Sequence, residues 1–299
     1  MSINFDLPAR SPFNFHSVVH SHGWCQVLPF HLDEQTGHLG YTLHLSTGKV
    51  VDLDISSIPG GIQIQTDQLD PDEQVEVTSV LTWMLGLDLD LSDFYDAIRG
   101  EPALVHVEKQ AMGRVLRSPT LFEDVIRTIL TTNTLWAATK RMTANLVGQF
   151  GESLPSDPTR KAFPTPKHLA QVSETQLRTE TRLGYRAPYI VDLAERVASS
   201  KLDLESLKTS PLPTLELRKE LLKLLGIGPY AAANLLMILG RSDFIPIDSW
   251  ALKMVSLEWH GGEPVTLAQV QAAFEKWGQW QGMVFWFWDW AYQHKSNPG

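Results

Sequence analysis

The hydrophobic pattern along the chain changes near residue 100. Before that point, short runs of β-branched and aromatic residues partly alternate with polar ones, in "GWCQVLPFHLD", "GHLGYTLHLS" and "GKVVDLDIS". Gly, Asp or Ser bounds each run, as is typical of antiparallel strands. The segment "DPDEQVEVTSVLTWMLGL" then predicts a helix, with Pro71 and acidic residues in its first turn. The first hundred residues are therefore predicted to be α+β.

From about residue 119 the apolar residues recur with a helical period. Ser118 and Pro119 predict the cap and first turn of a helix over "LFEDVIRTIL". The polar "TTNT" interrupts the pattern, and a second helix ends near Gly151. Further helices are predicted in "TPKHLAQVSETQLRTET", "APYIVDLAERVASS", "PTLELRKELLKLLG", "PYAAANLLMILG", "DSWALKMVSLEW", "TLAQVQAAFEKWG" and "GMVFWFWDWAYQH". Short Gly/Pro connections between them predict a compact all-helical unit.

The predicted fold class is therefore α+β, with an antiparallel sheet domain over residues 1–108 and a mostly α-helical domain over residues 109–299. A chain of 299 residues is long enough for two domains.

Composition and charge narrow the class of protein. No apolar run reaches the roughly 18 residues of a membrane span, and the N-terminus lacks the features of a secretory signal, so we expect a cytoplasmic protein without a membrane partner. The single Cys25 excludes an intrachain disulfide and an iron–sulfur cluster that needs four thiolates. The net charge of −9 argues against a nucleic-acid partner for the chain as a whole, though not for one face of it.

The stretch "LLGIGPYAAANLL", residues 224–236, carries the clearest candidate chemistry. Gly226 is a residue type that ends helices in the left-handed conformation, and Pro229 favours the first position of the next helix. The small Gly228 leaves backbone amides uncovered at a helix N-terminus, where a phosphate binds readily. A tight corner between two helices, without a ligand, fits the same glycines equally well.

The segment "LLKLLGIGPYAAANLL" resembles the helix-hairpin-helix element of DNA-binding proteins, at about residues 216–240. An aspartate follows it in "FIPIDSWALK", and this pairing resembles the signature of the helix-hairpin-helix (HhH-GPD) DNA glycosylase superfamily. "SPTLFEDVIRTILTTNT" and "LGYRAPYIVDLAERV" are similar to the 8-oxoguanine branch, whereas "WGQWQGMVFWFW" is similar to the 3-methyladenine branch. The resemblance covers nearly the whole chain in order.

This resemblance implies roles for individual residues. Asp248 would stabilise the positive charge that develops on the sugar, or orient the attacking water; as a lone Asp before a helix it would be an N-cap, and both roles are compatible. Gly226, Gly228 and Ala231 would bind DNA phosphate. The backbone carbonyls of Leu222, Leu224 and Ile227 would hold a structural Na⁺ or K⁺.

The resemblance implies that three further residues take part in flipping the base out and binding it. Tyr230 stands where glycosylases with lyase activity carry a lysine that forms a Schiff base, so a monofunctional enzyme is implied; packing within its helix is the alternative. Asn133 would fill the space that the base leaves, or else cap a helix. Trp286 would line the base pocket, although most of the C-terminal tryptophans are expected in the core. Gln281 stands where the alkyladenine branch has an arginine.

The resemblance thus implies a monofunctional DNA N-glycosylase of base-excision repair, which releases a damaged purine from double-stranded DNA and leaves an abasic site. We expect a monomer that needs no catalytic cofactor and, in a bacterium, associates with the nucleoid. We expect alkylated purines as substrates, because Tyr230 and the tryptophan-rich end favour them; the asparagine turn and "LGYRA" favour the alternative, 8-oxoguanine. A non-catalytic DNA-damage binding protein, or an enzyme that acts on a substrate other than nucleic acid, remains an alternative.

Overall fold

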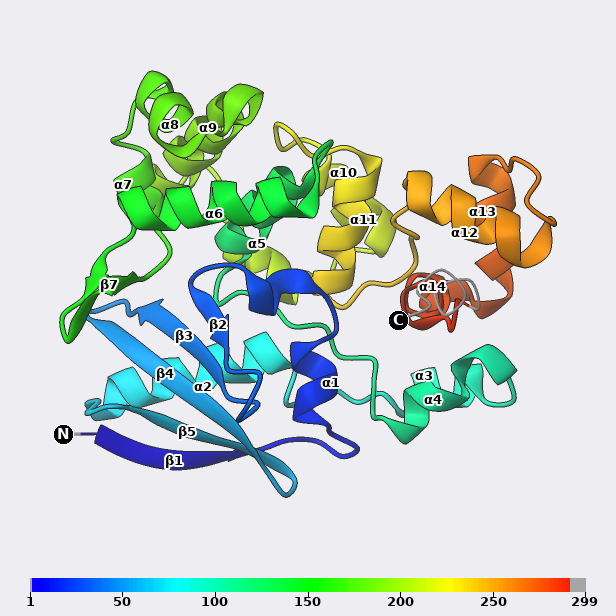
Figure 1. The fold of residues 1–299 in the computed structure, drawn as a ribbon, viewed down its shortest axis with the longest axis horizontal. Helices are drawn as coiled ribbons and strands as arrows, with labels where there is room; N and C mark the ends of the chain where they lie inside the picture. Colours follow the sequence, from blue (N-terminus) through cyan, green and yellow to red (C-terminus); the bar gives the residue numbers. More distant parts are fainter. Residues whose placement is uncertain (1, 291–299) are drawn as a thin grey trace. The chain divides into compact units, whose positions relative to one another are not determined.

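The computed structural model describes residues 2–290 (Figure 1). The chain forms two compact units, which are taken in turn. Unit 1 comprises residues 1–89, 114–210 and 224–226, and unit 2 comprises residues 90–113, 211–223 and 227–299. Within the described residues, no helix is both long and apolar enough to cross a membrane.

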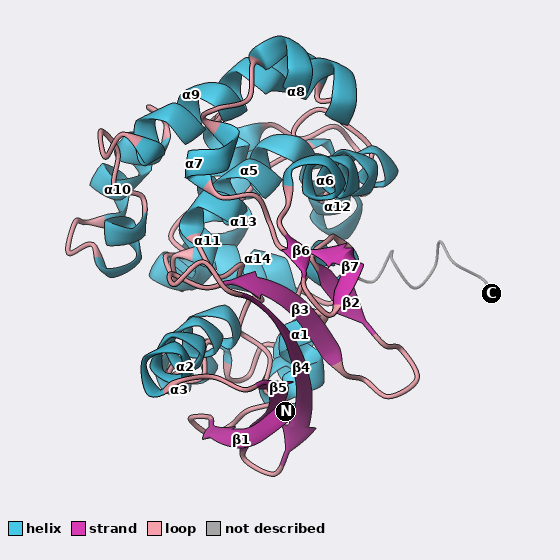
Figure 2. Cartoon of the chain, turned by 90° about the vertical axis from the view of Figure 1, so that its left-hand side faces the viewer, coloured by secondary structure: helices cyan, strands magenta, loops and turns pink. Residues whose placement is uncertain are grey.

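Unit 1 contains a five-stranded antiparallel sheet in the order β1-β5-β4-β3-β2. The strands are β1 (Ser2–Pro8), β2 (Phe30–Leu32), β3 (Leu39–His44), β4 (Val50–Ile58) and β5 (Gly61–Asp67). In β4, Val51, Leu53 and Ile55 are buried, while Asp52 and Asp54 point to the other face, because successive side chains of a strand alternate. The helices α1 (Phe15–Val19) and α2 (Pro71–Leu85) lie beside the sheet (Figure 2), and α1 packs against α2 and β4.

The remaining part of unit 1 is a helical layer with a small hairpin. Its helices are α5 (Leu121–Thr131), α6 (Trp136–Phe150), α7 (Pro166–Leu169), α8 (Glu174–Thr181) and α9 (Ala187–Ala198). The strands β6 (Ser153–Leu154) and β7 (Asp157–Lys161) pair between α6 and α7, so the predicted all-helical composition of this region is wrong at that hairpin.

Unit 2 is helical in its described part. It contains α3 (Ser92–Ile98), α4 (Val105–Lys109), α10 (Thr214–Leu221), α11 (Pro229–Ile238), α12 (Ser249–Trp259), α13 (Leu267–Phe274) and α14 (Gln281–Phe287). Helix α11 packs against α10 and α14, and α13 packs against α12 and α14. The end of the predicted segment "GMVFWFWDWAYQH", from residue 291, lies outside the described residues.

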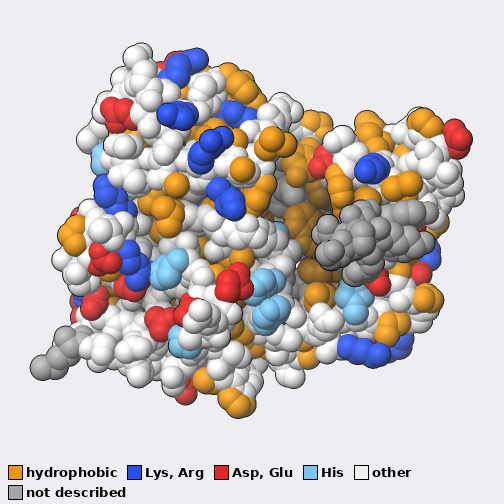
Figure 3. All heavy atoms as spheres, viewed as in Figure 1, with side chains coloured by type: hydrophobic (Ala, Val, Ile, Leu, Met, Phe, Trp, Pro, Cys, Tyr) orange, Lys and Arg blue, Asp and Glu red, His pale blue; other side chains and the backbone are white. Residues whose placement is uncertain are grey.

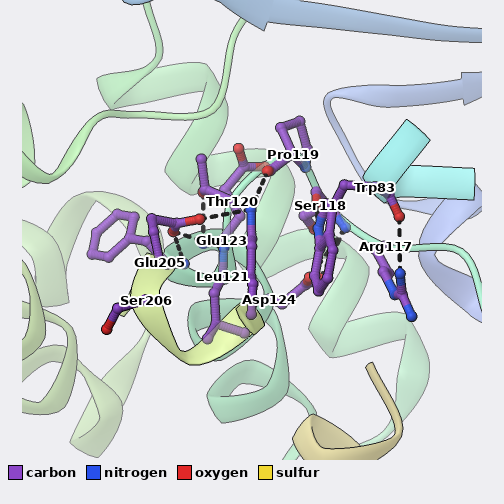
Figure 4. Close-up of polar contacts among 12 residues, drawn as sticks. Trp83, Arg117, Ser118, Pro119, Thr120, Leu121, Glu123, Asp124, Glu205 and Ser206 are labelled. Carbon is purple, nitrogen blue, oxygen red and sulfur yellow. Dashed lines mark hydrogen bonds and ion pairs between the residues drawn. The ribbon is translucent and has the colours of Figure 1, made fainter. Parts of the chain in front are cut away.

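Polar groups hold the start of α5 within unit 1 (Figure 4). Thr120 is the N-cap and accepts from the backbone N–H of Glu123 at 3.2 Å, so the predicted cap at Ser118 and Pro119 is wrong. The reason is that α5 begins at Leu121, so the residue directly before it is Thr120, while the backbone N–H of Ser118 donates to the buried carboxylate of Asp124 at 3.1 Å. Glu205 accepts from the N–H of Leu121 at 2.9 Å, an acid at a helix N-terminus where negative charge is favoured.

Glu123 on α5 connects this helix to the sheet. Its carboxylate accepts from the hydroxyl of Tyr41 at 2.5 Å and lies 3.6 Å from the guanidinium of Arg127, which is only 1% exposed. The Arg127 guanidinium lies 5.4 and 5.2 Å from the ring centroids of Phe30 and Phe163. Burial raises the pKa of Glu123 from its ordinary 4.5 to about 7, although the charge of Arg127 opposes that shift.

This raised pKa predicts a pH-dependent stability. Folded protein binds the Glu123 proton more tightly than unfolded protein does, so the contribution is complete below about pH 4.5 and is lost as pH rises through about 7. Between pH 4.5 and pH 7, the wild type should lose about 3 kcal/mol of unfolding free energy through Glu123, and Glu123→Gln should abolish this loss. Urea melts of both proteins at pH 5 and pH 8 measure this, and equal pH dependence in the two proteins would contradict it.

Candidate DNA-binding and active site

The hairpin between α10 and α11 has the backbone that its glycines predict. Gly226 has φ +83°, the left-handed conformation predicted for it. A Cβ at this position would lie 2.6 Å from the ring of Tyr189, so both conformation and space require glycine. Helix α10 ends earlier than predicted, at Leu221, because its last turn tightens: the N–H of Lys223 donates to the carbonyl of Glu220, at 3.1 Å.

Gly228 serves a different purpose from Gly226. It is the N-cap of α11 with an extended backbone, φ −95° and ψ −175°, which other residues adopt as well. A Cβ added there would meet no atom within 4 Å. The space beside Gly228 is therefore open, next to the first amides of α11, including those of Tyr230 and Ala231. These amides have no acceptor one turn earlier in the helix, so an external anion can reach them.

Asp248 is the N-cap of α12, the role predicted for a lone aspartate before a helix. Its Oδ1 accepts from the backbone N–H of Ala251 at 2.9 Å, and the residue is exposed. In the described part of the chain no hydrogen bond ends on Oδ2, so this oxygen keeps its lone pairs for another group. The cap fixes the direction of the carboxylate without covering it.

Within unit 2, the charge of Asp248 acts on the side chain of Tyr230. Burial, followed by the negative charge of Asp248, raises the pKa of the Tyr230 hydroxyl above its ordinary value. Tyr230 is the second residue of α11, and Trp286 is a partly exposed residue of α14, which packs against α11. Helix packing thus brings the elements of these two predicted base-pocket residues together.

The loop that leads to Asp248 is held by the start of α14. The side chain of Gln281 donates to the carbonyl of Asp243, and the N–H of Gly282 donates to the carbonyl of Ser242 at 2.7 Å. Thr214, at the start of α10, donates to the carboxylate of Asp243 at 2.9 Å. Gln281 therefore fixes this loop, a role that its position in the sequence did not reveal.

Most of the C-terminal tryptophans lie in the core, as predicted. Trp277, Trp288 and Trp290 are buried and form edge-to-face or tilted contacts with one another or with Phe274, at centroid distances of 5.6 to 6.3 Å. Trp250, which the sequence analysis did not single out, is 40% exposed two residues after Asp248. Its only sequence signal is that spacing.

Asn133 lies in unit 1, in the turn between α5 and α6. Its φ is +48°, a conformation that Asn tolerates better than most residues, and its side chain is exposed. Leu135 in the same turn is 80% exposed, more than any other large apolar side chain in the described residues. Asn133 caps neither helix, because the N-cap of α6 is Leu135 and the C-cap of α5 is Thr132.

Charge is distributed unevenly within unit 1. Residues 1–89 carry 11 acidic and 2 basic side chains, a net charge of −9, whereas residues 114–210 carry 10 acidic and 14 basic ones, a net charge of +4. In Figure 3, Lys and Arg side chains gather over α6 to α9 and acidic ones over the sheet. The objection that an acidic chain avoids nucleic acid therefore does not apply to this helical layer.

Comparison with known proteins decides the family. Residues 126–279, more than half of the chain, match the model of the HhH-GPD superfamily of base excision DNA repair proteins. The chain belongs to this superfamily. The HhH-GPD protein is 26% identical over 218 residues to the DNA-3-methyladenine glycosylase of Bacillus subtilis, which covers 71% of each chain. It is thus a homologue of DNA glycosylases.

Two solved structures share the fold of this HhH-GPD protein. The 3-methyladenine DNA glycosylase of Archaeoglobus fulgidus has a TM-score of 0.74 at 21% identity, with 95% of this chain and 97% of that one covered. The 8-oxoguanine glycosylase/lyase of Clostridium acetobutylicum has a TM-score of 0.70 at 21% identity, with the same coverage. Both substrate branches therefore share this fold, and the fold does not distinguish between them.

The two hairpin glycines give opposite predictions when each is replaced by alanine. Gly226→Ala should lower the free energy of unfolding by about 1–3 kcal/mol, because of its left-handed backbone and the ring of Tyr189. Gly228→Ala should cost no more than about 1 kcal/mol, but should weaken duplex DNA binding about tenfold by filling the open space beside the amides. Thermal melting and fluorescence anisotropy measure the two effects, and unchanged DNA affinity of Gly228→Ala would contradict the phosphate site.

Proposed function

We propose that this protein is a monofunctional DNA N-glycosylase, which flips an alkylated purine out of double-stranded DNA, releases it and leaves an abasic site. The observation that carries the proposal is the carboxylate of Asp248 in unit 2, which is exposed and is held in place by its hydrogen bond to the N–H of Ala251. Its negative charge acts on the hydroxyl of Tyr230, whose pKa it raises. DNA repair by base excision is the function of the superfamily to which the chain belongs.

Asp248 is the proposed catalytic residue. Cleavage of the N-glycosidic bond leaves positive charge on the sugar, and a carboxylate nearby lowers the energy of that state. The free Oδ2 faces this charge or accepts a proton from the attacking water, while Oδ1 stays on the amide of Ala251. The hydroxide of that water ends on the sugar and its proton passes through Asp248 to solvent, while a cationic alkylated purine keeps the electron pair of the broken bond and leaves as a neutral base.

Tyr230 supports the monofunctional assignment. A phenol cannot form a Schiff base with the sugar, so the ring of Tyr230 serves instead as a flat wall for the flipped nucleotide. Trp286 offers a second aromatic surface. A cationic alkylated purine stacks well on such rings and leaves without a strong general acid, which favours alkylated purines over 8-oxoguanine. The name of the Bacillus subtilis relative agrees with this choice.

The proposed contact with DNA uses the hairpin and Asn133. The open space at Gly228 admits a phosphate oxygen to the amides of Tyr230 and Ala231, with Gly226 shaping the turn before it. Asn133 enters the space that the flipped base leaves. Phosphate contact positions the protein without reading the sequence.

The carbonyls of Leu222, Leu224 and Ile227 suit a monovalent cation, since in the described chain no backbone N–H donates to them. A bound Na⁺ or K⁺ would add positive charge beside the phosphate. Replacing K⁺ by tetramethylammonium at constant ionic strength should therefore weaken duplex binding by severalfold. Equal affinity in both salts, measured by anisotropy, would refute the cation site but leave the amide site in place.

Base release tests the proposed function directly. Single-turnover assays use duplexes with 3-methyladenine, 7-methylguanine, hypoxanthine, 8-oxoguanine or uracil. We expect release by the wild type, greatest for the methylated purines, with strand cuts only after alkali. Asp248→Asn should be at least about 100-fold slower.

The asparagine substitution is its own control for folding. Asn caps helices as well as Asp does, so the melting temperature should stay unchanged. Equal release by the variant would make Asp248 only a cap, and binding of damaged duplexes without release would favour the non-catalytic binding protein. Strand cuts without alkali would contradict the monofunctional assignment.

A further inference from the structure

Arg186 is a buried cation that faces backbone carbonyls. It ends the 3₁₀ turn Gly184–Arg186 before α9 and is only 7% exposed. Its guanidinium donates to the carbonyl of Thr132, and through Nε to the carbonyl of Ile129 at 3.3 Å. In the described part of the chain it forms no ion pair with a carboxylate. Arg186 therefore places its charge at the negative end of the α5 dipole.

The end of α5 shows what these bonds accomplish. The last carbonyls of a helix lack partners within it. Here the hydroxyls of Thr131 and Thr139 donate to the carbonyls of Thr128 and Leu130, at 2.7 and 3.0 Å. The carbonyls of Ile129 and Thr132 both accept from Arg186, and that of Ile129 also accepts from the hydroxyl of Thr132 at 2.8 Å. Side chains of unit 1 thus hold the backbone at the end of α5, just before the turn.

Among the described residues, the turn from Asn133 to Leu135 has no comparable side-chain support before Trp136, whose indole donates to Gln26 at 2.9 Å. Asn133 has a left-handed backbone and an exposed side chain, and no side chain caps the start of α6 at Leu135. Arg186 is also stacked 4.5 Å from the ring centroid of Tyr185, which is 47% exposed. One buried guanidinium therefore connects the turn that carries Asn133 to an exposed aromatic residue of another segment.

We infer that Arg186 is a positioning residue for base extrusion: it fixes the carbonyls at the end of α5 so that the turn presents Asn133 to the duplex in one conformation. The inference rests on the proposed function. Arg186 acts here through the backbone rather than through DNA: its side chain is only 7% exposed, and two of its five N–H donors go to the carbonyls of Ile129 and Thr132. A lysine cannot replace it, since a single ammonium lacks the fork that reaches two carbonyls.

Arg186→Lys in the full chain tests this role, with Arg196→Lys as the matched control. Arg196 lies on the neighbouring α9, is half-buried, and pairs with Asp192 at 3.3 Å. Base release is measured in single turnover for a methylated purine in a normal pair and for the same lesion opposite an abasic site. Extrusion is followed by the fluorescence of 2-aminopurine next to the lesion.

We expect Arg186→Lys to slow both extrusion and release about tenfold for the paired lesion, and less than about threefold for the unpaired one, which costs less to flip. The control should match the wild type on both. Equal slowing on both substrates would mean a structural role and would overturn the inference. A loss that depends on which base stands opposite the lesion would mean direct reading and would overturn it too.

A double-mutant cycle keeps the test decisive if Arg186→Lys lowers stability. In an Asn133→Ala background, Arg186→Lys should have little further effect on release of the paired lesion, because both changes disable the same turn. Additive losses would overturn the inference. If the wild type releases no base from any lesion, the proposed function fails and the inference fails with it, whereas release by the wild type and equal release by Arg186→Lys refute the inference alone.

Discussion

Each proposed functional segment lies at a helix end, where backbone groups lack partners within the helix. At the N-termini of α11 and α12 the exposed groups are amides: those beside Gly228 are left for a phosphate, and one of those at α12 is used by Asp248. At the C-terminus of α5 they are carbonyls, and Arg186 with three threonines donates to those of Thr128, Ile129, Leu130 and Thr132. The same constraint thus yields an anion site, a fixed carboxylate and a fixed turn.

Electrostatics explain how an acidic chain belongs to a DNA repair superfamily. The excess negative charge resides in residues 1–89, which form the sheet and its two covering helices, while residues 114–210 of the same unit are basic. A polyanion is therefore attracted to the helical layer and repelled by the sheet, which orients the protein during encounter. The sheet is tied to this layer by the buried Glu123, Tyr41 and Arg127.

The sequence predicted the elements whose signals are local. Strands form within the three period-2 runs, although the first run begins with a 3₁₀ helix over Gly23–Gln26 before β2. The helix that begins at Pro71 with acidic residues in its first turn and the left-handed Gly226 are also present. Strands β1 and β5 were not predicted, although "SINFDLP" and "GIQIQTD" carry the same alternation. The roles of Arg186 and Gln281 were out of reach, because each depends on a carbonyl between 38 and 57 residues away in the chain. Local patterns locate the helices, but only tertiary packing shows what satisfies their ends.

The central claim is that the charge of Asp248 stabilises a cationic sugar, and binding of a cationic sugar mimic tests it most directly. Affinities are compared for a duplex with a protonated pyrrolidine in place of the damaged nucleotide and for one with a neutral tetrahydrofuran. The wild type should prefer the cationic duplex, since an enzyme binds mimics of its transition state tightly. Asp248→Asn, which keeps the helix cap, should lose this preference. The same preference in both proteins would contradict the claim.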